Sequence, residues 1–226
     1  MTLAETLPPR GHQAQRAYMA IKDKLLNGAF RPGDTLSIEA LAAEIGVSRQ
    51  PVLEAMRRLS GDGMVEIIPQ VGCRVARHDS QSIGDFFFLF ATVESLAARL
   101  AAERRDLVGL KRLARLSDDI EALTRPGASE NDRANGYQRL NREFHGQIHA
   151  MAEAPEIVRL AASFWDRSDF HIANAGQTAL FSDRLELAHD DHEEIMDALE
   201  RGDGPQAEAL MRDHILGFRA AILQRL

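Results

Sequence analysis

The stretch of the chain that decides its fold reads Ser37-Ile-Glu-Ala-Leu41-Ala-Ala-Glu-Ile45-Gly46-Val47-Ser48-Arg49-Gln50-Pro51-Val52. Ser37 and Ser48 are residue types that cap helix starts, and Leu41 gives the first helix an inward apolar side chain. Pro51 falls in the first turn of the second helix, where its missing N–H does no harm. We therefore expect two short helices joined through Ile45-Gly46-Val47. This is a helix-turn-helix whose second helix can enter the major groove of DNA.

The residues on either side extend this motif into a winged helix. A preceding helix is predicted from apolar residues at helical spacing, namely Ala14, Tyr18, Ile21 and Leu25. After the motif, strand-like runs at Met64–Ile68 and Cys73–Ala76 flank Pro69-Gln-Val-Gly72 and predict a hairpin, or wing. Residues 10–77 are thus expected to form three helices plus a β-hairpin wing. The pattern leaves open the alternative that such a unit has no role in DNA binding.

The rest of the chain is expected to be all α, which makes the protein mainly α. Helical stripes run over Ile83–Arg104, Leu107–Leu123, Asn135–Ala152, Pro155–Phe170, Phe181–Arg201 and Pro205–Leu226. Six or seven helices predict an α-helical bundle over residues 83–226, with sites formed between facing helices. Residues 78–82 are polar and are expected to be a linker.

Composition and charge are consistent with two modules that have different partners. The 226 residues carry a net charge of −7, with 10 Lys and Arg against 8 Asp and Glu up to Arg77, and 17 against 26 beyond it. The acidic total therefore does not argue against DNA. The longest apolar run, Phe86–Ala91, is too short to span a membrane. The single Cys73 fits a reducing cytosol, and Met1–Arg10 lacks the layout of a secretory signal. We expect a cytoplasmic protein without membrane contact.

The first module resembles the winged helix of GntR-family bacterial transcription regulators. The matching residues are Asn27-Gly28-Ala-Phe-Arg-Pro32-Gly33-Asp34-Thr-Leu36, Leu41-Ala42, Gly46-Val-Ser-Arg49, Pro51-Val52, Asp62-Gly63 and Gly72-Cys-Arg-Val75. The resemblance implies a homodimer that binds a palindromic double-stranded operator, since twofold protein symmetry mirrors a palindrome.

The same resemblance implies DNA-contacting residues. Arg49 is expected to read a base edge, because a guanidinium that forks onto guanine O6 and N7 gives about 1–3 kcal/mol of discrimination. Gln50 is a second reader, and Ser48 and Gly72 would hold phosphates. Further candidates for phosphate contact are Arg57, Arg58 and Arg74.

The chain departs from the family pattern at two positions in this motif. Many relatives carry arginine where this sequence has Glu39 and Leu53. Glu39 would repel phosphate, so we expect a different operator and a greater dependence on Arg49 and Gln50.

Histidines are the chemically interesting residues of the second module. Asn141 and His145 are four residues apart and share one helix face, while His192 and His214 lie on two later helices. Three imidazoles from three helices can converge on a divalent metal. A packed core of hydrogen-bonded imidazoles is the alternative.

The second module resembles the FCD domain of the FadR branch of the same family. The resemblance is carried by Asn141-Arg-Glu-Phe144-His145, Asp191-His192-Glu-Glu-Ile195, Gly202-Asp203 with Ala207, and Met211-Arg-Asp-His214. It implies an effector-binding and dimerisation domain in which Asn141, His145, His192 and His214 hold a Zn-, Ni- or Mn-type ion. Asn141 stands where many relatives carry Asp. Because an amide oxygen is neutral, we expect an anionic effector to bind the ion more tightly.

The expected effector is a small organic acid. Phe90 stands where relatives often place an arginine that meets an acid, so the pocket wall is expected to be apolar and a polar sugar acid is disfavoured. The residues that could replace that arginine as anion partners are Arg99, Arg139 and Arg142.

Together these features predict a metal-containing transcription regulator, expected to be a repressor, that responds to a small carboxylate. The alternative is a metal-dependent enzyme of an α-helical bundle with an accessory winged-helix docking domain. The sequence offers that enzyme no nucleophile, and no positioned general base beyond Glu193 and Glu194.

Overall fold

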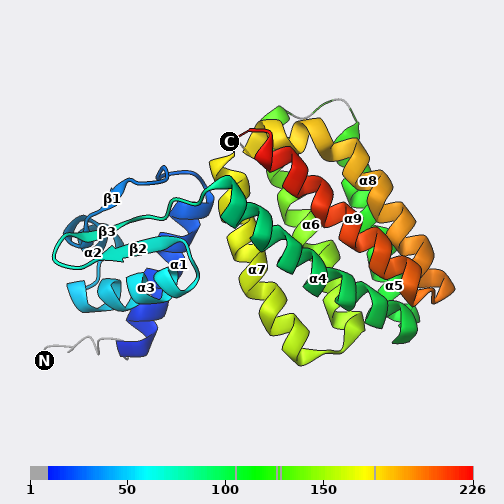
Figure 1. The fold of residues 1–226 in the computed structure, drawn as a ribbon, viewed down its shortest axis with the longest axis horizontal. Coiled ribbons are helices and arrows are strands. Elements are labelled where there is room, and N and C mark those ends of the chain that lie inside the picture. The colour runs from blue at the N-terminus through cyan, green and yellow to red at the C-terminus, as the bar shows by residue number, and fades with distance from the viewer. Residues whose placement is uncertain (1–9, 105, 126, 128, 176, 226) are drawn as a thin grey trace, which may run out of the picture. The chain divides into compact units, whose positions relative to one another are not determined.

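The computed structural model describes residues 10–104, 106–125, 127, 129–175 and 177–225. The chain is mainly helical and divides into two compact units between His78 and Asp79. The first unit carries a small sheet, and the described residues of the second form a helical bundle (Figure 1). Residues 1–9, which were judged to lack a secretory signal, lie outside the described residues. No described helix is long and apolar enough to cross a membrane.

The first unit is a winged helix with one strand more than the sequence predicts. Its elements are α1 (Arg10–Leu26), β1 (Thr35–Leu36), α2 (Ile38–Ile45), α3 (Arg49–Gly61), β2 (Val65–Ile68) and β3 (Gly72–Val75). The sheet has the order β1-β3-β2 and is antiparallel. The added strand β1 pairs Thr35 with Arg74 and Leu36 with Cys73. Two residues are too few to show the alternation that marks a strand in sequence, so only pairing with the wing reveals it.

Local signals fix the helix-turn-helix. The Ser37 hydroxyl accepts a hydrogen bond from the Ala40 N–H at 3.2 Å and caps α2. Gly46 ends α2 with φ of 73°, a left-handed conformation that glycine adopts without strain. Ser48 has the extended backbone of an N-cap, but its side chain makes no capping hydrogen bond in α3. Its hydroxyl is therefore not engaged in capping the helix.

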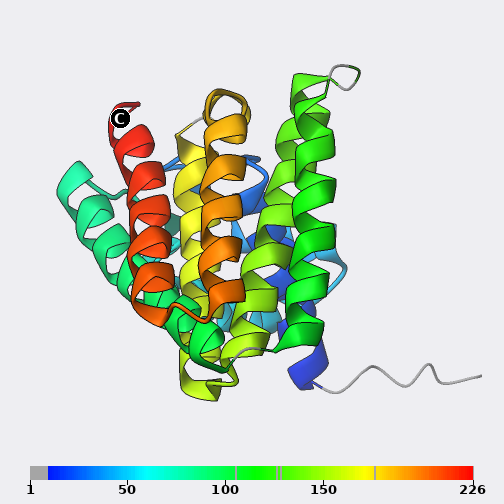
Figure 2. The same cartoon turned by 90° about the vertical axis from the view of Figure 1, so that its right-hand side faces the viewer.

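The second unit contains six helices in its described part. They are α4 (Ser80–Arg104), α5 (Leu107–Thr124), α6 (Glu130–Ala152), α7 (Pro155–Asn174), α8 (Gln177–Arg201) and α9 (Gly204–Leu223). Helix α6 is central, because it packs on α4, α5, α7 and α8 (Figure 2). Side chains on its inward face are therefore positioned to meet those of the surrounding helices.

Several helix boundaries differ from those expected. Helix α7 ends four residues later than predicted, at Asn174, and α8 begins four residues earlier, at Gln177. Helix α4 begins at Ser80, so residues 80–82 of the predicted linker belong to its first turn. Helix α6 begins at Glu130, five residues before the predicted start, because the Ser129 hydroxyl caps it by accepting from the Asp132 N–H. The first turn of α6 is polar and exposed, so it carries no apolar stripe that would indicate a helix in the sequence.

Leu59 lies in the core of the winged helix, so we expect its truncation to lower the stability of this unit. This side chain is fully buried, as are Met56 and Ile21, so Leu59→Ala should lower the free energy of unfolding by about 2–5 kcal/mol. Val71→Ala is the matched control, because Val71 is 75% exposed and should change stability by less than about 0.5 kcal/mol. Chemical denaturation followed by circular dichroism measures both, and equal effects would contradict the packing described here.

Candidate metal centre and DNA-binding surface

Three histidines from three helices of the second unit meet in the core. His145 of α6, His192 of α8 and His214 of α9 are at most 2% exposed. One ligand nitrogen from each lies within 4.8 Å of the others. The structure therefore brings together the three imidazoles that the sequence placed on separate helices.

Neighbouring carboxylates orient two of these rings. His145 Nδ1 lies 2.9 Å from Glu94 Oε2, and His214 Nδ1 lies 3.0 Å from Asp191 Oδ2. A carboxylate accepts the Nδ1–H of neutral imidazole, which leaves the lone pair on Nε2. This arrangement, with a carboxylate behind the ring, is typical of histidines that bind metals.

The remaining nitrogens of the three rings have no hydrogen-bond partner in the part of the chain that the structure describes. His145 Nε2, His214 Nε2 and both nitrogens of His192 are buried without a hydrogen-bond partner among the described residues. Each buried polar atom left in this state costs about 1–3 kcal/mol. A divalent cation would satisfy the converging lone pairs, so the donor set fits a metal of the Zn, Ni or Mn type. A core of hydrogen-bonded imidazoles, the alternative left by the sequence, would not leave these atoms unpaired.

Glu94 of α4 is the organising residue behind the site. Its other oxygen, Oε1, lies 2.8 Å from His149 Nε2 and accepts the indole N–H of Trp165 at 3.1 Å. Burial alone would raise the pKa of Glu94, but the hydrogen bonds to His145 and His149 outweigh burial and lower it to about 2. Burial also lowers the pKa of His145 to about 4, against the opposing effect of Glu94. At neutral pH, Glu94 is thus an anion and the His145 ring is neutral.

Asn141 lies one turn before His145 and is 6% exposed. Its Oδ1 accepts a hydrogen bond from the Tyr137 hydroxyl at 3.3 Å. An oxygen held in this way has a second lone pair for a cation, although it brings no negative charge.

A small cavity of about 10 Å³ borders His214 and Asn141. It has room for roughly one water molecule. Its aromatic wall consists of Phe87, Phe90, Trp165, Phe181 and Phe218. Phe90 packs edge-to-face on Trp165 with ring centres 5.3 Å apart. Gln138, Ser168 and Asp169 also line the cavity, so the aromatic wall stands beside polar side chains. A larger ligand enters only if the rings shift.

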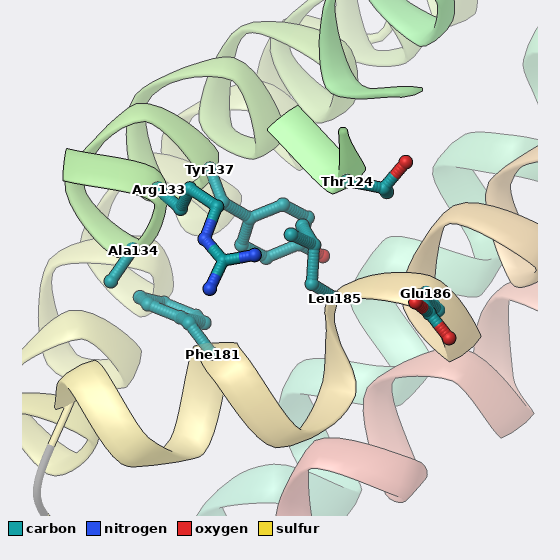
Figure 3. A pocket seen from close by; sticks show the side chains of 7 residues that line it. All are labelled: Thr124, Arg133, Ala134, Tyr137, Phe181, Leu185 and Glu186. Atoms are coloured by element: carbon teal, nitrogen blue, oxygen red, sulfur yellow. The ribbon is translucent and has the colours of Figure 1, made fainter. Parts of the chain in front are cut away.

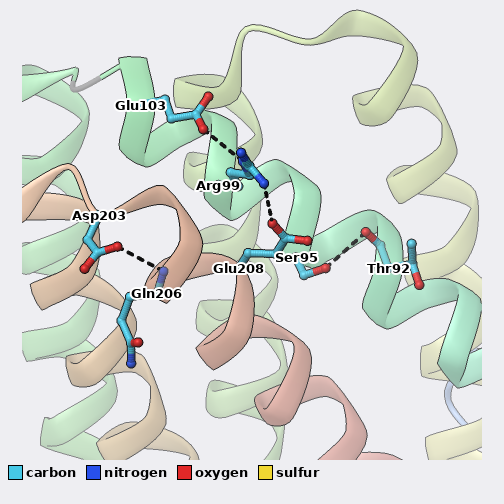
Figure 4. A network of polar contacts seen from close by, with 7 residues as sticks. All are labelled: Thr92, Ser95, Arg99, Glu103, Asp203, Gln206 and Glu208. Carbon is cyan, nitrogen blue, oxygen red and sulfur yellow. Dashed lines mark hydrogen bonds and ion pairs between the residues drawn. The ribbon is translucent and has the colours of Figure 1, made fainter.

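None of the three arginines proposed as anion partners lines this cavity. Arg99 is exposed and pairs with Glu103 and Glu208 at 2.9 and 3.1 Å (Figure 4). Arg139 is also exposed and pairs with Glu143 at 2.8 Å.

Arg142 is engaged by two carboxylates, at 2.5 Å from Asp166 and 2.6 Å from Asp169. It borders a different cavity, on the far side of Trp165. None of these three side chains borders the cavity beside His214. The role of Arg99, Arg139 and Arg142 at an effector site therefore stays a prediction. Helical spacing does not show which arginines have carboxylate neighbours on other helices.

On the helix-turn-helix, Arg49 and Gln50 begin α3 and are exposed, as is Ser48 before them. Arg49 Nη2 pairs with Glu39 Oε1 at 2.6 Å, and both side chains are more than 60% exposed. Glu39 thus contacts the expected base-reading residue instead of standing alone. A guanidinium has five N–H donors, so this pair leaves donors available for a base edge.

The other DNA candidates differ in availability. Arg57 is exposed, and Gly72 lies at the wing with φ of 134°. Arg58 donates to Gln15 Oε1 at 2.7 Å and stacks on Tyr18, while Arg74 pairs with Glu66 at 2.6 Å. Arg58 and Arg74 are thus partly engaged, and each keeps N–H donors that could hold phosphate.

Comparison with known proteins agrees with this architecture. The chain matches the bacterial regulatory proteins of the gntR family over residues 13–75 and the FCD domain over residues 85–217. An HTH-type transcriptional regulator in an unstable DNA locus of Streptomyces ambofaciens is 30% identical over 203 residues, which are 88% of this chain and 80% of that protein. The HTH-type transcriptional repressor GlaR of Escherichia coli is 26% identical over 206 residues, 88% of this chain and 90% of GlaR.

A solved structure shares the fold. Escherichia coli McbR/YncC superimposes with a TM-score of 0.72 at 20% identity, covering 94% of this chain and 97% of that one.

The winged helix joined to this helical domain defines a DNA-binding transcription regulator. The chain belongs to the GntR family and carries an FCD domain. The relatives named here are regulators, so the reading as a metal-dependent enzyme is set aside.

Sequence reasoning missed the supporting residues of the histidine site. Glu94 lies in a largely apolar stretch of α4. Its contacts with His145, His149 and Trp165 form only when α4, α6 and α7 pack together. The four-residue spacing of His145 and His149 was the available signal, because it places both rings on one face. His149 is 7% exposed and contacts Glu94.

Replacing Glu94 by glutamine should weaken metal binding. The amide cannot supply the negative charge that His145 contacts, and removing such a partner typically costs about 10–100-fold in metal affinity. Chelator competition with zinc measures the effect. The control is Glu103→Gln on the same helix, where the carboxylate is exposed and pairs with Arg99. Equal affinities for wild type and Glu94→Gln would contradict the role given to Glu94.

Proposed function

We propose that this transcription regulator is a repressor whose operator binding is controlled by a small organic acid bound at a divalent metal in the second unit. The observation that carries the proposal is the set of three buried imidazoles with unpaired nitrogens beside an aromatic cavity. Repression is the action named for the relative GlaR.

In this proposal His145, His192 and His214 hold the ion, and Asn141 offers an amide oxygen. When bound, the ion supplies a positive charge that attracts the carboxylate of the effector. The protein orients the imidazoles through Glu94 and Asp191 and excludes water with the aromatic wall. Since three imidazoles and an amide are all neutral, the ion keeps its full charge for an anionic ligand.

Operator recognition is proposed to depend on the start of α3. Arg49 and Gln50 would read base edges in the major groove, while Ser48 and Gly72 contact phosphates. The first unit carries little net positive charge, so non-specific attraction to DNA should be modest. Specific binding then depends on a few placed residues and on two copies binding together.

Dimerisation is proposed to use the exposed face of α4. Phe88, Leu89 and Leu96 are 49%, 54% and 42% exposed, and they lie at helical spacing around Thr92. A contiguous apolar face of this kind is typical of a protein interface. Because α4 also carries Glu94, a shift of the site on effector binding would be transmitted to the dimer. The effector must favour one dimer geometry, since equal affinity for both would change nothing.

Arg49→Ala should abolish specific operator binding and leave the fold intact. The operator is first identified by selecting genomic fragments bound by the wild-type protein, and affinity is then measured by fluorescence anisotropy. Arg115→Ala removes an exposed positive charge from the second unit and serves as the control. Near-native affinity of Arg49→Ala, with an unchanged circular dichroism spectrum, would refute the assignment of Arg49.

A charge on the apolar face of α4 should separate the dimer. Leu89→Glu places a carboxylate in the proposed interface, so light scattering coupled to size exclusion should report a monomer. Leu107→Glu is the control, because Leu107 is 64% exposed at the start of α5. A Leu89→Glu protein that keeps the mass of a dimer would show that this face is not the interface.

A further inference from the structure

A second cavity lies between α5, α6 and α8, and the positively charged side chain of Arg133 lines it. Its volume is about 50 Å³, which is room for a few water molecules or a carboxylate group. Arg133 and Tyr137 of α6 line it together with Phe181 and Glu186 of α8. The Arg133 guanidinium points between the rings of Tyr137 and Phe181, while Glu186 lies on the opposite side (Figure 3).

Among the described residues, Arg133 has no acidic partner like those that pair with the other arginines of α6. Its Nε is buried without a hydrogen-bond partner, and Arg133 forms no ion pair with any described residue. By contrast, Arg139 pairs with Glu143, and Arg142 pairs with two aspartates. A buried guanidinium nitrogen without an acceptor is unfavourable, and an anionic ligand would supply that acceptor.

The cavity is connected to the histidine site along one face of α6. Arg133, Tyr137, Asn141 and His145 follow one another at intervals of four residues and therefore form a row on the helix. The Tyr137 hydroxyl donates to Asn141 Oδ1 at 3.3 Å. Phe181 lines both this cavity and the one beside His214. A shift of the Phe181 ring would thus join the two spaces.

A second guanidinium adds positive charge at the same place. Arg184 lies over the Phe218 ring at 5.0 Å, and its Nε is also buried without a hydrogen-bond partner among the described side chains. Burial raises the pKa of Tyr137, whereas the nearby positive charge of Arg184 opposes that rise and Asp191 adds to it. Asp191 is already engaged by His214, and Glu186 is exposed. The row on α6 therefore has the Arg133 guanidinium at one end, in a cavity that Glu186 also lines, and, under the proposed function, a metal at the other end.

We propose that Arg133 binds a second anionic group of the effector, so that the effector is a dicarboxylate lying along α6. One carboxylate binds at the metal site and the other accepts hydrogen bonds from Arg133, while the carbon chain contacts Tyr137 and Phe181. This inference rests on the proposed function, because it assumes that the first carboxylate binds at the histidine site. It replaces Arg99, Arg139 and Arg142 with Arg133 as the anion partner.

The test compares acids with one and two carboxylates on the zinc-loaded, full-length protein. The probes are succinate, glutarate and adipate, with butyrate as the acid with one carboxylate, and calorimetry measures each affinity. Arg133→Gln should weaken binding of the best dicarboxylate by about 10–100-fold, which is the loss expected for a charge-assisted hydrogen bond. Butyrate affinity and zinc content should not change. Arg139→Gln is the matched control on the same helix and should bind all four acids like wild type.

Three outcomes would overturn the inference. Arg133→Gln could bind dicarboxylates like wild type, it could lose butyrate and dicarboxylate affinity in parallel, or the wild-type protein could bind none of the three dicarboxylates at millimolar concentration. Arg133→Lys keeps the positive charge but loses the bidentate geometry of the guanidinium. Its affinity for the dicarboxylate should therefore lie between those of the wild type and Arg133→Gln, which guards against a folding defect in the glutamine variant. Zinc content and operator binding are measured on the same preparations. If zinc content and operator binding are normal but one of these three outcomes occurs, only this inference fails. If the wild-type protein binds no zinc or no operator, the proposed function fails.

Discussion

The hydrogen bond between Glu94 and His145 is the interaction on which the second unit depends. Both groups are buried, and a carboxylate in that position is stable only because His145, His149 and Trp165 all direct polar atoms at it. Through its hydrogen bonds with these side chains, Glu94 connects α4 with α6 and α7. It also favours the His145 tautomer that carries its lone pair on Nε2, the atom that could bind a metal together with His192 and His214.

A metal would complete an arrangement that otherwise carries an energetic penalty. Each unpaired imidazole nitrogen is a buried polar atom without a partner, and the three rings come from helices that are distant in sequence. Binding an ion would connect α6, α8 and α9 and stabilise the bundle, because a ligand that binds only the folded state raises its stability. Under the proposed function, the same connection would let an effector move helices, since the cavity beside the site opens only if aromatic side chains shift.

The parts of the structure that could be predicted from the sequence are those set by local signals. Ser37 and Gly46 define the helix-turn-helix because capping and left-handed turns depend on neighbouring residues alone. The histidines were found because they match a known pattern and lie on faces that periodicity reveals. Strand β1 was missed because Thr35–Leu36 is extended only through pairing with β3. Glu94 and Arg133 were missed for a related reason: their roles depend on which helix faces which, and periodicity does not contain that information.

The metal content of the purified protein tests the account most directly. Protein prepared without chelator, and analysed by inductively coupled plasma mass spectrometry, should contain about one divalent ion per chain, the number that a single set of three histidines can hold. His192→Ala should reduce that content sharply, because it removes the ring whose two nitrogens have no other partner among the described residues. A wild-type protein that is free of metal and does not bind added Zn²⁺ or Ni²⁺ would contradict the central claim.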